Sequence, residues 1–170
     1  DRLRDEAAAM NSPLVMLSSG DNFLAGPEFN ASLDRNPALP YYDAIVVDSI
    51  GYDALCLGNH DFDFGPAVLA NFIQDVSATQ PPFLSANLDF SGEAALQSLV
   101  NSGRIAQSTI IDRGGDRIGV VGATTPLLAS ISSPGGVTVS QQVADSVQAE
   151  VDALTAQGVE NIILISHLQN

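Results

Sequence analysis

Short apolar runs along the chain end in polar residues at three places. Runs of about four apolar residues bounded by turn-forming residues are typical of buried strands. The runs are residues 14–17, 54–57 and 162–165, and they lead into Ser18-Ser19-Gly20-Asp21-Asn22, Gly58-Asn59-His60-Asp61-Phe62-Asp63 and Ser166-His167. In open α/β sheets, ligands bind at the C-terminal ends of the strands. The pattern therefore predicts three strand ends that present Asp21, Asn59 with His60, and His167.

Between these runs, apolar residues recur at the spacing of helices. One helix is predicted before Gly51, which would end it, from the positions of Tyr42, Ile45, Val46, Ser49 and Ile50. A second is predicted from Pro66 to about Val76, and its inward face is Val68, Leu69, Phe72 and Ile73. A helix between two strands forms a βαβ unit, so these strands are predicted to be parallel.

The other segments are interpreted in the same way. Residues 1–10 are interpreted as the end of a helix, 83–87 as a strand, and 93–100 as a weak helix or an insertion. An alternating run at 106–112, the turn Gly114-Gly115 and the run at 117–123 predict a β-hairpin in a second sheet. Ser140 is predicted to cap a helix that Gly158 stops, and residues 132–136 are expected to form a loop at the rim of the site.

Length and composition limit the possible classes of protein. With 170 residues, 45% of them hydrophobic, the chain suits one globular domain. It carries 20 acidic and 6 basic residues, all six of them Arg, for a formal net charge of −14. Such a surface repels phosphate backbones, so nucleic-acid binding is not expected. No apolar run is long enough to predict a membrane span. The sequence contains no signal for an oligomeric state.

Cys56 is the single cysteine of the sequence and lies within an apolar run. A lone cysteine forms no intrachain disulfide, and burial predicts an inert thiol. His60 is four residues away, which on a strand is more than about 10 Å. A Cys–His catalytic pair is therefore not expected.

The polar residues at the strand ends suit phosphate-ester hydrolysis. Two divalent metals about 3.5 to 4 Å apart can clamp a phosphate and lower the pKa of the attacking water. Such a site uses carboxylate, amide oxygen and imidazole ligands, and Asp21, Asn59 and His167 are of these types. Each also has a structural interpretation, because Asp and Asn are common in turns and a lone His is more often structural.

Taken together, the motifs resemble those of a known family. Gly20-Asp21-Asn22, Gly58-Asn59-His60-Asp61-Phe62-Asp63 and Ser166-His167 resemble the central motifs of the calcineurin-like metallophosphoesterases, and most closely their 5'-nucleotidase and UDP-sugar hydrolase branch. The segments at 85–88 and 119–126 are similar to others of that branch. The resemblance implies an α/β fold, a metallophosphoesterase-like β-sandwich flanked by helices in α-β-β-α layers, incomplete at both ends.

The resemblance also implies roles for individual residues. Asp21 would bridge two metals, and Asn59 and His167 would ligate the second. His60 would contact the substrate phosphate and act on the leaving group, and Asp63 would orient its imidazole. Asn87 is a weaker candidate for substrate binding at the rim. The metals would be Mn, Zn, Fe or Co, and the sequence does not choose among them.

Other motifs fit these residues less well. Asp61, Asp63 and Gly65 are spaced like part of a calcium loop, but the third oxygen ligand before the glycine and the distal Glu are missing. No phosphate-binding Walker loop, Gly-x-Ser-x-Gly elbow or dinucleotide fingerprint occurs in the sequence. A phosphoesterase site remains the preferred hypothesis.

The resemblance leaves parts of the family pattern unmatched. In the family, the first metal takes an Asp and a His from an earlier strand and a His from a later Gly-His-x-His motif, whereas His60 and His167 are the only histidines here. Residues 1–170 are therefore expected to be part of a catalytic domain, without those segments and without the substrate domain. The isolated chain is expected to be inactive.

For the complete protein, the resemblance implies a hydrolase of nucleotide phosphoesters that uses metal-activated water, in an extracellular or periplasmic location. A phosphodiesterase or 2',3'-cyclic nucleotide hydrolase on the same centre is the enzymatic alternative. An inactive domain that serves as a binding or structural module is the alternative from another class.

Overall fold

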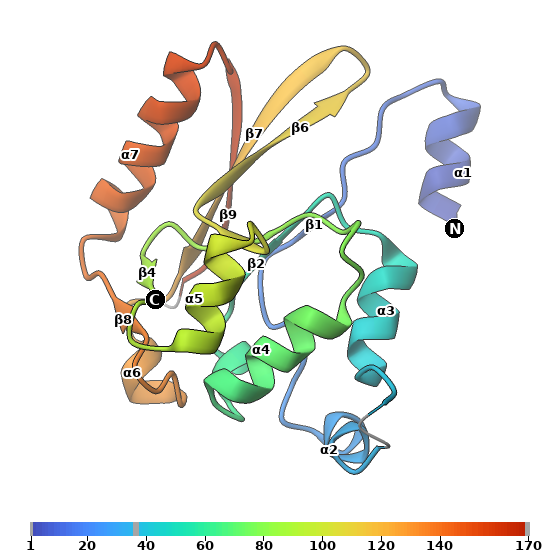
Figure 1. The fold of residues 1–170 in the computed structure, drawn as a ribbon. Coiled ribbons are helices and arrows are strands. Elements are labelled where there is room, and N and C mark those ends of the chain that lie inside the picture. The colour runs from blue at the N-terminus through green and yellow to red at the C-terminus, as the bar shows by residue number, and fades with distance from the viewer. Residues whose placement is uncertain (1, 36–37, 169–170) are drawn as a thin grey trace.

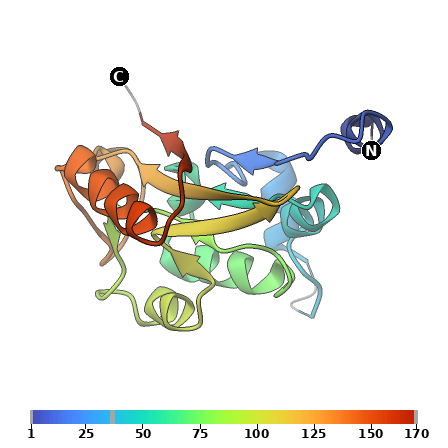
Figure 2. The ribbon, with the colours of Figure 1, turned by 90° about the horizontal axis from the view of Figure 1, so that it is seen from above.

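The structure is a computed structural model, and it describes residues 2–35 and 38–168. Two sheets pack face to face with helices on both outer sides (Figures 1 and 2). The first sheet is parallel, with strand order β1 (Leu17–Ser18), β2 (Ala54–Cys56), β3 (Phe83–Leu84) and β5 (Ile105–Ala106). The predicted α-β-β-α sandwich is confirmed.

The second sheet contains the predicted hairpin. β6 (Ser108–Arg113) and β7 (Asp116–Thr124) pair antiparallel, and β9 (Asn161–His167) pairs with β7 in parallel. A separate antiparallel pair is formed by β4 (Leu88–Asp89) and β8 (Thr138–Val139). The β7–β9 register places Thr124 opposite His167, so both residues lie at the same end of the sheet.

Helices cover both faces of the sandwich. The outer face of the first sheet is covered by α2 (Pro27–Leu33), α3 (Tyr42–Ile50), α4 (Pro66–Asp75) and α5 (Ala94–Asn101). Helix α7 (Val143–Ala156) covers β7 in the second sheet, and α6 (Leu128–Ile131) is a short helix near β8. Helix α1 (Arg2–Ala9) has no buried residue and stands apart in both views. A helix was predicted within residues 1–10, and α1 lies within that range. Residue 1 lies outside the described residues.

Alternation along the central strands explains the layers. On β2, Leu55 points into the core beneath the helices, whereas Ala54 and Cys56 point into the core between the sheets. On β7, Val120 lies between the sheets and Val121 faces α7. Strands buried on both faces are expected to be continuously apolar, as these are.

Helix α4 has the predicted inward face. Leu69, Phe72 and Ile73 are buried, and Val68 packs against the same core. Helix α3 has the predicted bounds, and Gly51 caps it in the left-handed conformation with φ 65°. Its face is different from the apolar stripe in the sequence: Ala44 and Val47 are buried, while Tyr42, Ile45 and Val46 are exposed. Ala44 and Val47 both belong to the core beneath the helices.

The start of α7 also differs from the sequence prediction. Gln142, rather than Ser140, is the N-cap residue. The Ser140 hydroxyl accepts from the Gln142 backbone N–H at 3.2 Å, and the chain turns once more before the helix starts. In the described ranges, none of the helices has both the length and the apolar content to cross a membrane.

Candidate active site

Three chain segments bring Asp21, Asn59 and His167 together. Asp21 follows β1, Asn59 follows β2, and His167 ends β9 in the other sheet. His167 Nε2 lies 3.1 Å from Asp21 Oδ2 and 3.1 Å from Asn59 Oδ1. The backbone N–H of His60 donates to Asp21 Oδ1 at 3.0 Å, which joins the first two loops directly. The predicted meeting of strand ends is therefore present in the fold.

The hydrogen bonds of His167 determine which of its nitrogens carries a proton. Nδ1 lies 3.1 Å from the backbone oxygen of Ser19, which can only accept, so Nδ1 is the donor. Nε2 lies beside two oxygens that also only accept. Such a cluster of acceptors suits a bound cation. Carboxylate, amide and imidazole donors fit a divalent transition metal.

His60 and Asp63 form a second unit beside this cluster. They lie one turn apart on η1 (His60–Phe62) and its C-cap, and His60 Nδ1 is 2.5 Å from Asp63 Oδ2. The hydrogen bond with Asp63 raises the pKa of His60, helped by the charges of Asp63, Asp21 and Asp61 and opposed by partial burial. The pairing of His60 with Asp63 leaves Nε2 of the ring available for a ligand.

Asp61 connects the two loops and was not assigned this role from the sequence. Its Oδ2 accepts from the Gly58 N–H at 2.7 Å and from Asn22 Nδ2 at 3.0 Å, and its Oδ1 accepts from the Asn22 N–H at 2.8 Å. Burial raises the pKa of Asp61 to about 7, against the opposing effect of these N–H groups. Asp61 thereby clamps the loop of Asp21 to the loop of Asn59. The sequence signal that could have indicated this role is the position of Asp61 inside the polar motif.

Glycines allow these loops to touch. Gly20 has φ 106°, and a Cβ built there would lie 2.8 Å from the Gly58 Cα. A Cβ on Gly58 would overlap Asp21 Oδ1 and the Asp21 backbone nitrogen. Asp21 itself has φ 53°, the left-handed region that Asp tolerates better than most residues. The loop contact therefore needs a residue without Cβ at both glycine positions.

A buried phenylalanine anchors each of the two loops that carry Asp21 and Asn59. Phe23 is 2% exposed and stacks on Phe29 with ring centroids 4.2 Å apart, and Phe62 is fully buried. These rings fix the ends of the two loops in the core beneath the helices. Burial of such side chains is worth about 1.5–3 kcal/mol each, so the loop positions are held by the core.

Asn87 lies in the core rather than at an open rim. It is 3% exposed, its Oδ1 accepts from the Thr124 N–H at 2.9 Å, and its Nδ2 donates to the Thr124 oxygen at 2.7 Å. The Thr124 hydroxyl in turn donates to the Leu57 oxygen at 2.7 Å. This chain of bonds supports the loop that begins at Gly58, so the geometry favours a structural role for Asn87.

Replacing Asn87 tests that structural role. Asn87→Ala should lower the free energy of unfolding by about 2 kcal/mol, because it leaves the buried N–H and C=O of Thr124 without partners. Urea unfolding followed by circular dichroism would measure the change. Asn101→Ala, at an exposed helix end, is the matched control and should change stability little. Equal stability of both variants would contradict the structural role.

Cys56 is buried, as predicted. Burial raises the pKa of its thiol to about 12, and its sulfur lies 3.5 Å from the Ala123 oxygen. The thiol therefore stays protonated at neutral pH and offers no nucleophile.

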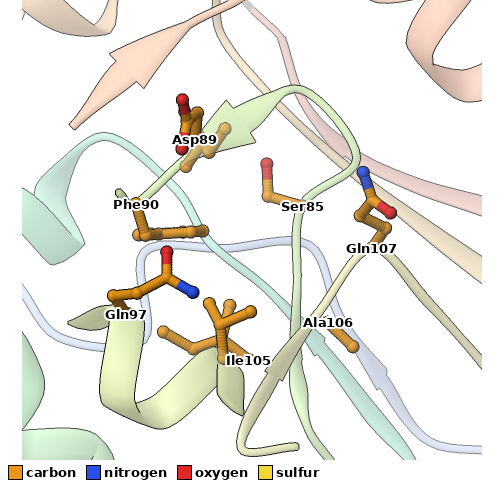
Figure 3. A pocket seen from close by; sticks show the side chains of 9 residues that line it. Ser85, Asp89, Phe90, Gln97, Ile105, Ala106 and Gln107 are labelled. Atoms are coloured by element: carbon orange, nitrogen blue, oxygen red, sulfur yellow. The ribbon is translucent and has the colours of Figure 1, made fainter. Parts of the chain in front are cut away.

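A hollow separate from this cluster has a volume of about 520 Å³. It lies between α5, β4 and β5, where Phe90 and Ile105 face Gln97 (Figure 3). Among the described residues that line it, Asp89 is the ionisable one. A smaller hollow of about 200 Å³ borders Asp21 and Asn22. Asp21 lines this smaller hollow, whereas His60 and His167 are not among the residues that line it. We therefore assign the candidate site from the contacts among the side chains at the strand ends.

Within the described ranges, no group of three or more His, Cys, Asp or Glu side chains is arranged to hold a metal ion. The cluster at the strand ends offers three potential ligands: the Asp21 carboxylate, the His167 imidazole and the Asn59 amide oxygen. The donor set is therefore smaller than that expected for two metals.

Known proteins similar to this chain include several 5'-nucleotidases. No family model matches the chain. A 5'-nucleotidase from Diplobatis ommata is 36% identical over 168 residues, which cover 96% of this chain and 26% of that protein. Snake venom 5'-nucleotidases are also among the relatives. The chain spans about a quarter of the length of these curated relatives.

Solved structures give the same result. A 5'-nucleotidase precursor from Thermus thermophilus superposes with a TM-score of 0.81 at 33% identity, over 96% of this chain and 30% of that chain. The calcineurin-like phosphoesterase YfkN from Bacillus subtilis superposes with a TM-score of 0.71 at 20% identity, over 97% of this chain and 51% of that chain. The fold is thus that of the calcineurin-like phosphoesterases. Within that class, the chain is homologous over nearly its whole length to part of the 5'-nucleotidases.

Proposed function

We propose that the protein carrying this chain is a metal-dependent hydrolase of nucleotide phosphoesters, of the 5'-nucleotidase or UDP-sugar hydrolase type. The observation that carries the proposal is the approach of Asp21 Oδ2 and Asn59 Oδ1 to His167 Nε2, each at 3.1 Å, beside the His60–Asp63 pair. Relatives named 5'-nucleotidase support a nucleotide substrate.

The cluster of Asp21, Asn59 and His167 would hold the divalent cation. Bound there, the cation would offset phosphate charge and lower the pKa of the attacking water. The backbone oxygen of Ser19 contributes by accepting a hydrogen bond from His167 Nδ1, which keeps Nε2 directed at the cluster. Asp61 contributes by holding the loops of Asp21 and Asn59 against each other.

His60 would act on the substrate rather than on the metal. Asp63 binds its Nδ1 and raises the pKa of the ring, so the imidazole keeps its proton to a higher pH than a free histidine. A protonated Nε2 can donate to a phosphate oxygen or to the leaving oxygen, as a general acid does. Asp63 would therefore orient His60 and stabilise its charged form.

Metal titration separates the two roles. Calorimetric titration of the protein with Mn²⁺ and Zn²⁺ should show binding that His167→Ala weakens by roughly tenfold or more, because one ligand is lost. His60→Asn is the matched variant: it should retain metal binding while lowering phosphate release from a nucleotide by about 100-fold. Loss of metal binding in His60→Asn would make His60 a ligand and overturn its assignment.

A non-catalytic module is the second candidate. The observation that favours it is the small donor set, which lacks three His, Cys, Asp or Glu ligands within the described ranges. Wild-type protein that binds Mn²⁺ but hydrolyses neither nucleoside monophosphates, nor UDP-sugars, nor 2',3'-cyclic nucleotides would favour the module. Hydrolysis of the cyclic substrate alone, which opens the ring to a nucleoside monophosphate without releasing phosphate, would favour the phosphodiesterase.

An extracellular or periplasmic location is part of the proposal. It is supported by relatives whose names describe venom enzymes. Cell fractionation with an antibody against this chain would test it.

A further inference from the structure

Ser132 is hydrogen-bonded to Asp63 from a loop far away in the sequence. Its hydroxyl donates to Asp63 Oδ1 at 2.9 Å, while the other oxygen of the same carboxylate, Oδ2, binds His60 Nδ1 at 2.5 Å. The two oxygens of Asp63 therefore have different partners. The sequence placed residues 132–136 near the rim of the site but offered no sign of this bond.

The position of Ser132 is fixed by buried structure on its N-terminal side. It is the C-cap residue of α6, with extended backbone angles of φ −149° and ψ −167°, and its N–H donates to the Leu128 oxygen at 3.0 Å. Leu128 is fully buried in the core that also contains Phe62. The hydroxyl is thus presented from a helix anchored in the same core as the His60 turn.

The C-terminal side of the loop is also held. The Gly136 N–H donates to Glu93 Oε1 at 2.6 Å, and a Cβ on Gly135 would lie 2.7 Å from Pro66 Cγ at the start of α4. Val137 is buried. The loop therefore packs against the helix that directly follows the motif containing His60 and Asp63.

A carboxylate bound through one oxygen can rotate about its terminal torsion, which is broad and lacks sharp minima. The Ser132 bond restrains that rotation because Oδ1 is held by a second element. It also stabilises the ionised carboxylate, since hydrogen bonds to charged groups are stronger than neutral ones. Both effects hold the Asp63 oxygen on the line of the His60 N–H.

We propose that Ser132 is a positioning residue, which orients Asp63 so that Asp63 in turn orients the His60 imidazole. The effect on hydrolysis rests on the proposed function, whereas the effect on the His60–Asp63 hydrogen bond does not. Measuring the hydrogen bond and the rate of hydrolysis separately distinguishes failure of the positioning role from failure of the proposed function.

The hydrogen bond is read by proton NMR of protein labelled with ¹⁵N-histidine. The His60 Nδ1 proton is assigned as the downfield imidazole signal that His60→Asn removes. Ser132→Ala should move this signal upfield and speed its exchange with water, because the carboxylate becomes mobile. Ser132→Thr, which keeps a hydroxyl and suits extended backbone, should restore it, and Ser133→Ala is the neighbouring control.

The kinetic reading uses the same variants in the active protein. Ser132→Ala should lower kcat about tenfold with KM little changed, Ser132→Thr should recover most of the loss, and Ser133→Ala should match wild type. An unchanged Nδ1 signal in Ser132→Ala would overturn the proposal. A changed signal in a protein whose wild type hydrolyses neither nucleoside monophosphates nor UDP-sugars would support the positioning role and reject the proposed function. If Ser132→Ala fails to fold, Ser132→Cys replaces it, with the same signal change expected.

Discussion

Asp61→Ala should lower the free energy of unfolding by about 3–5 kcal/mol, because three buried N–H groups lose their acceptor at once. The donors are the backbone N–H groups of Gly58 and Asn22 and the Asn22 side-chain amide. Alanine cannot accept from any of them, and the site is too enclosed for full hydration, since Asp61 is 1% exposed. Chemical unfolding monitored by circular dichroism would give the difference.

Asp116→Ala is the matched control for this change. Asp116 is exposed at the start of β7 in the hairpin turn region, and its removal should change stability by less than about 0.5 kcal/mol. If Asp61→Ala were as stable as Asp116→Ala, the loop clamp would be wrong, and the core beneath the helices would be sufficient to hold the loops together.

The pH dependence of the same comparison has a defined sign. Burial raises the pKa of Asp61 to about 7 from its ordinary value of 3.8, so the folded state binds its proton more tightly than the unfolded state does. Stability from this group is therefore present below about pH 4 and is lost as pH rises towards 7. The stability gap between wild type and Asp61→Ala, measured without metal, should be larger at pH 5 than at pH 8.

Asp61 also marks a limit of sequence-based prediction at this site. The pairing of His60 with Asp63 was implied by the family resemblance, and it joins residues three apart on one turn. One partner of Asp61 is Asn22, which lies 39 residues earlier, and no local pattern specifies that contact. The hydrogen bond from Ser132 to Asp63 spans 69 residues, and again no local pattern specifies it. The order of the strands in the sheets determines which distant polar side chains meet. The spacing of predicted strands along the sequence does not determine that order.

The fold itself was more predictable than the side-chain contacts. Apolar runs that end in polar motifs defined β2 and β9, and the turn at Gly114-Gly115 defined the hairpin. The face of α3 was not predictable from hydrophobicity, since Ala44 and Val47 are buried while Ile45 and Val46 stay exposed. Val46 and Val47 are the same residue type, so the placement of α3 against the core decides which side is buried. The catalytic and metal-binding roles of Asp21, Asn59, His60, Asp63 and His167 stay predictions.

Gly58→Ala is expected to have the largest effect on metal binding. The added Cβ would overlap Asp21 Oδ1 and the Asp21 backbone nitrogen, so one of the two loops must move. Movement separates Asp21 from Asn59 and His167, and it also disturbs the Gly58 N–H bond to Asp61. We expect Mn²⁺ affinity to fall by about 100-fold and the free energy of unfolding to fall by about 2–3 kcal/mol.

Calorimetric titration and urea unfolding of Gly58→Ala would measure both effects, and Gly26→Ala is the control. Gly26 has φ −110°, which alanine adopts freely, and its Cβ would meet only the flexible end of the Glu28 side chain at 3.1 Å. That control should bind Mn²⁺ as wild type does, with a loss of stability of about 1 kcal/mol or less. Equal Mn²⁺ affinity in Gly58→Ala and wild type would mean that the contact between the loops does not position the ligands. Asp21 would then no longer be assigned to the proposed metal site, because a ligand whose loop has moved could not support the same Mn²⁺ affinity.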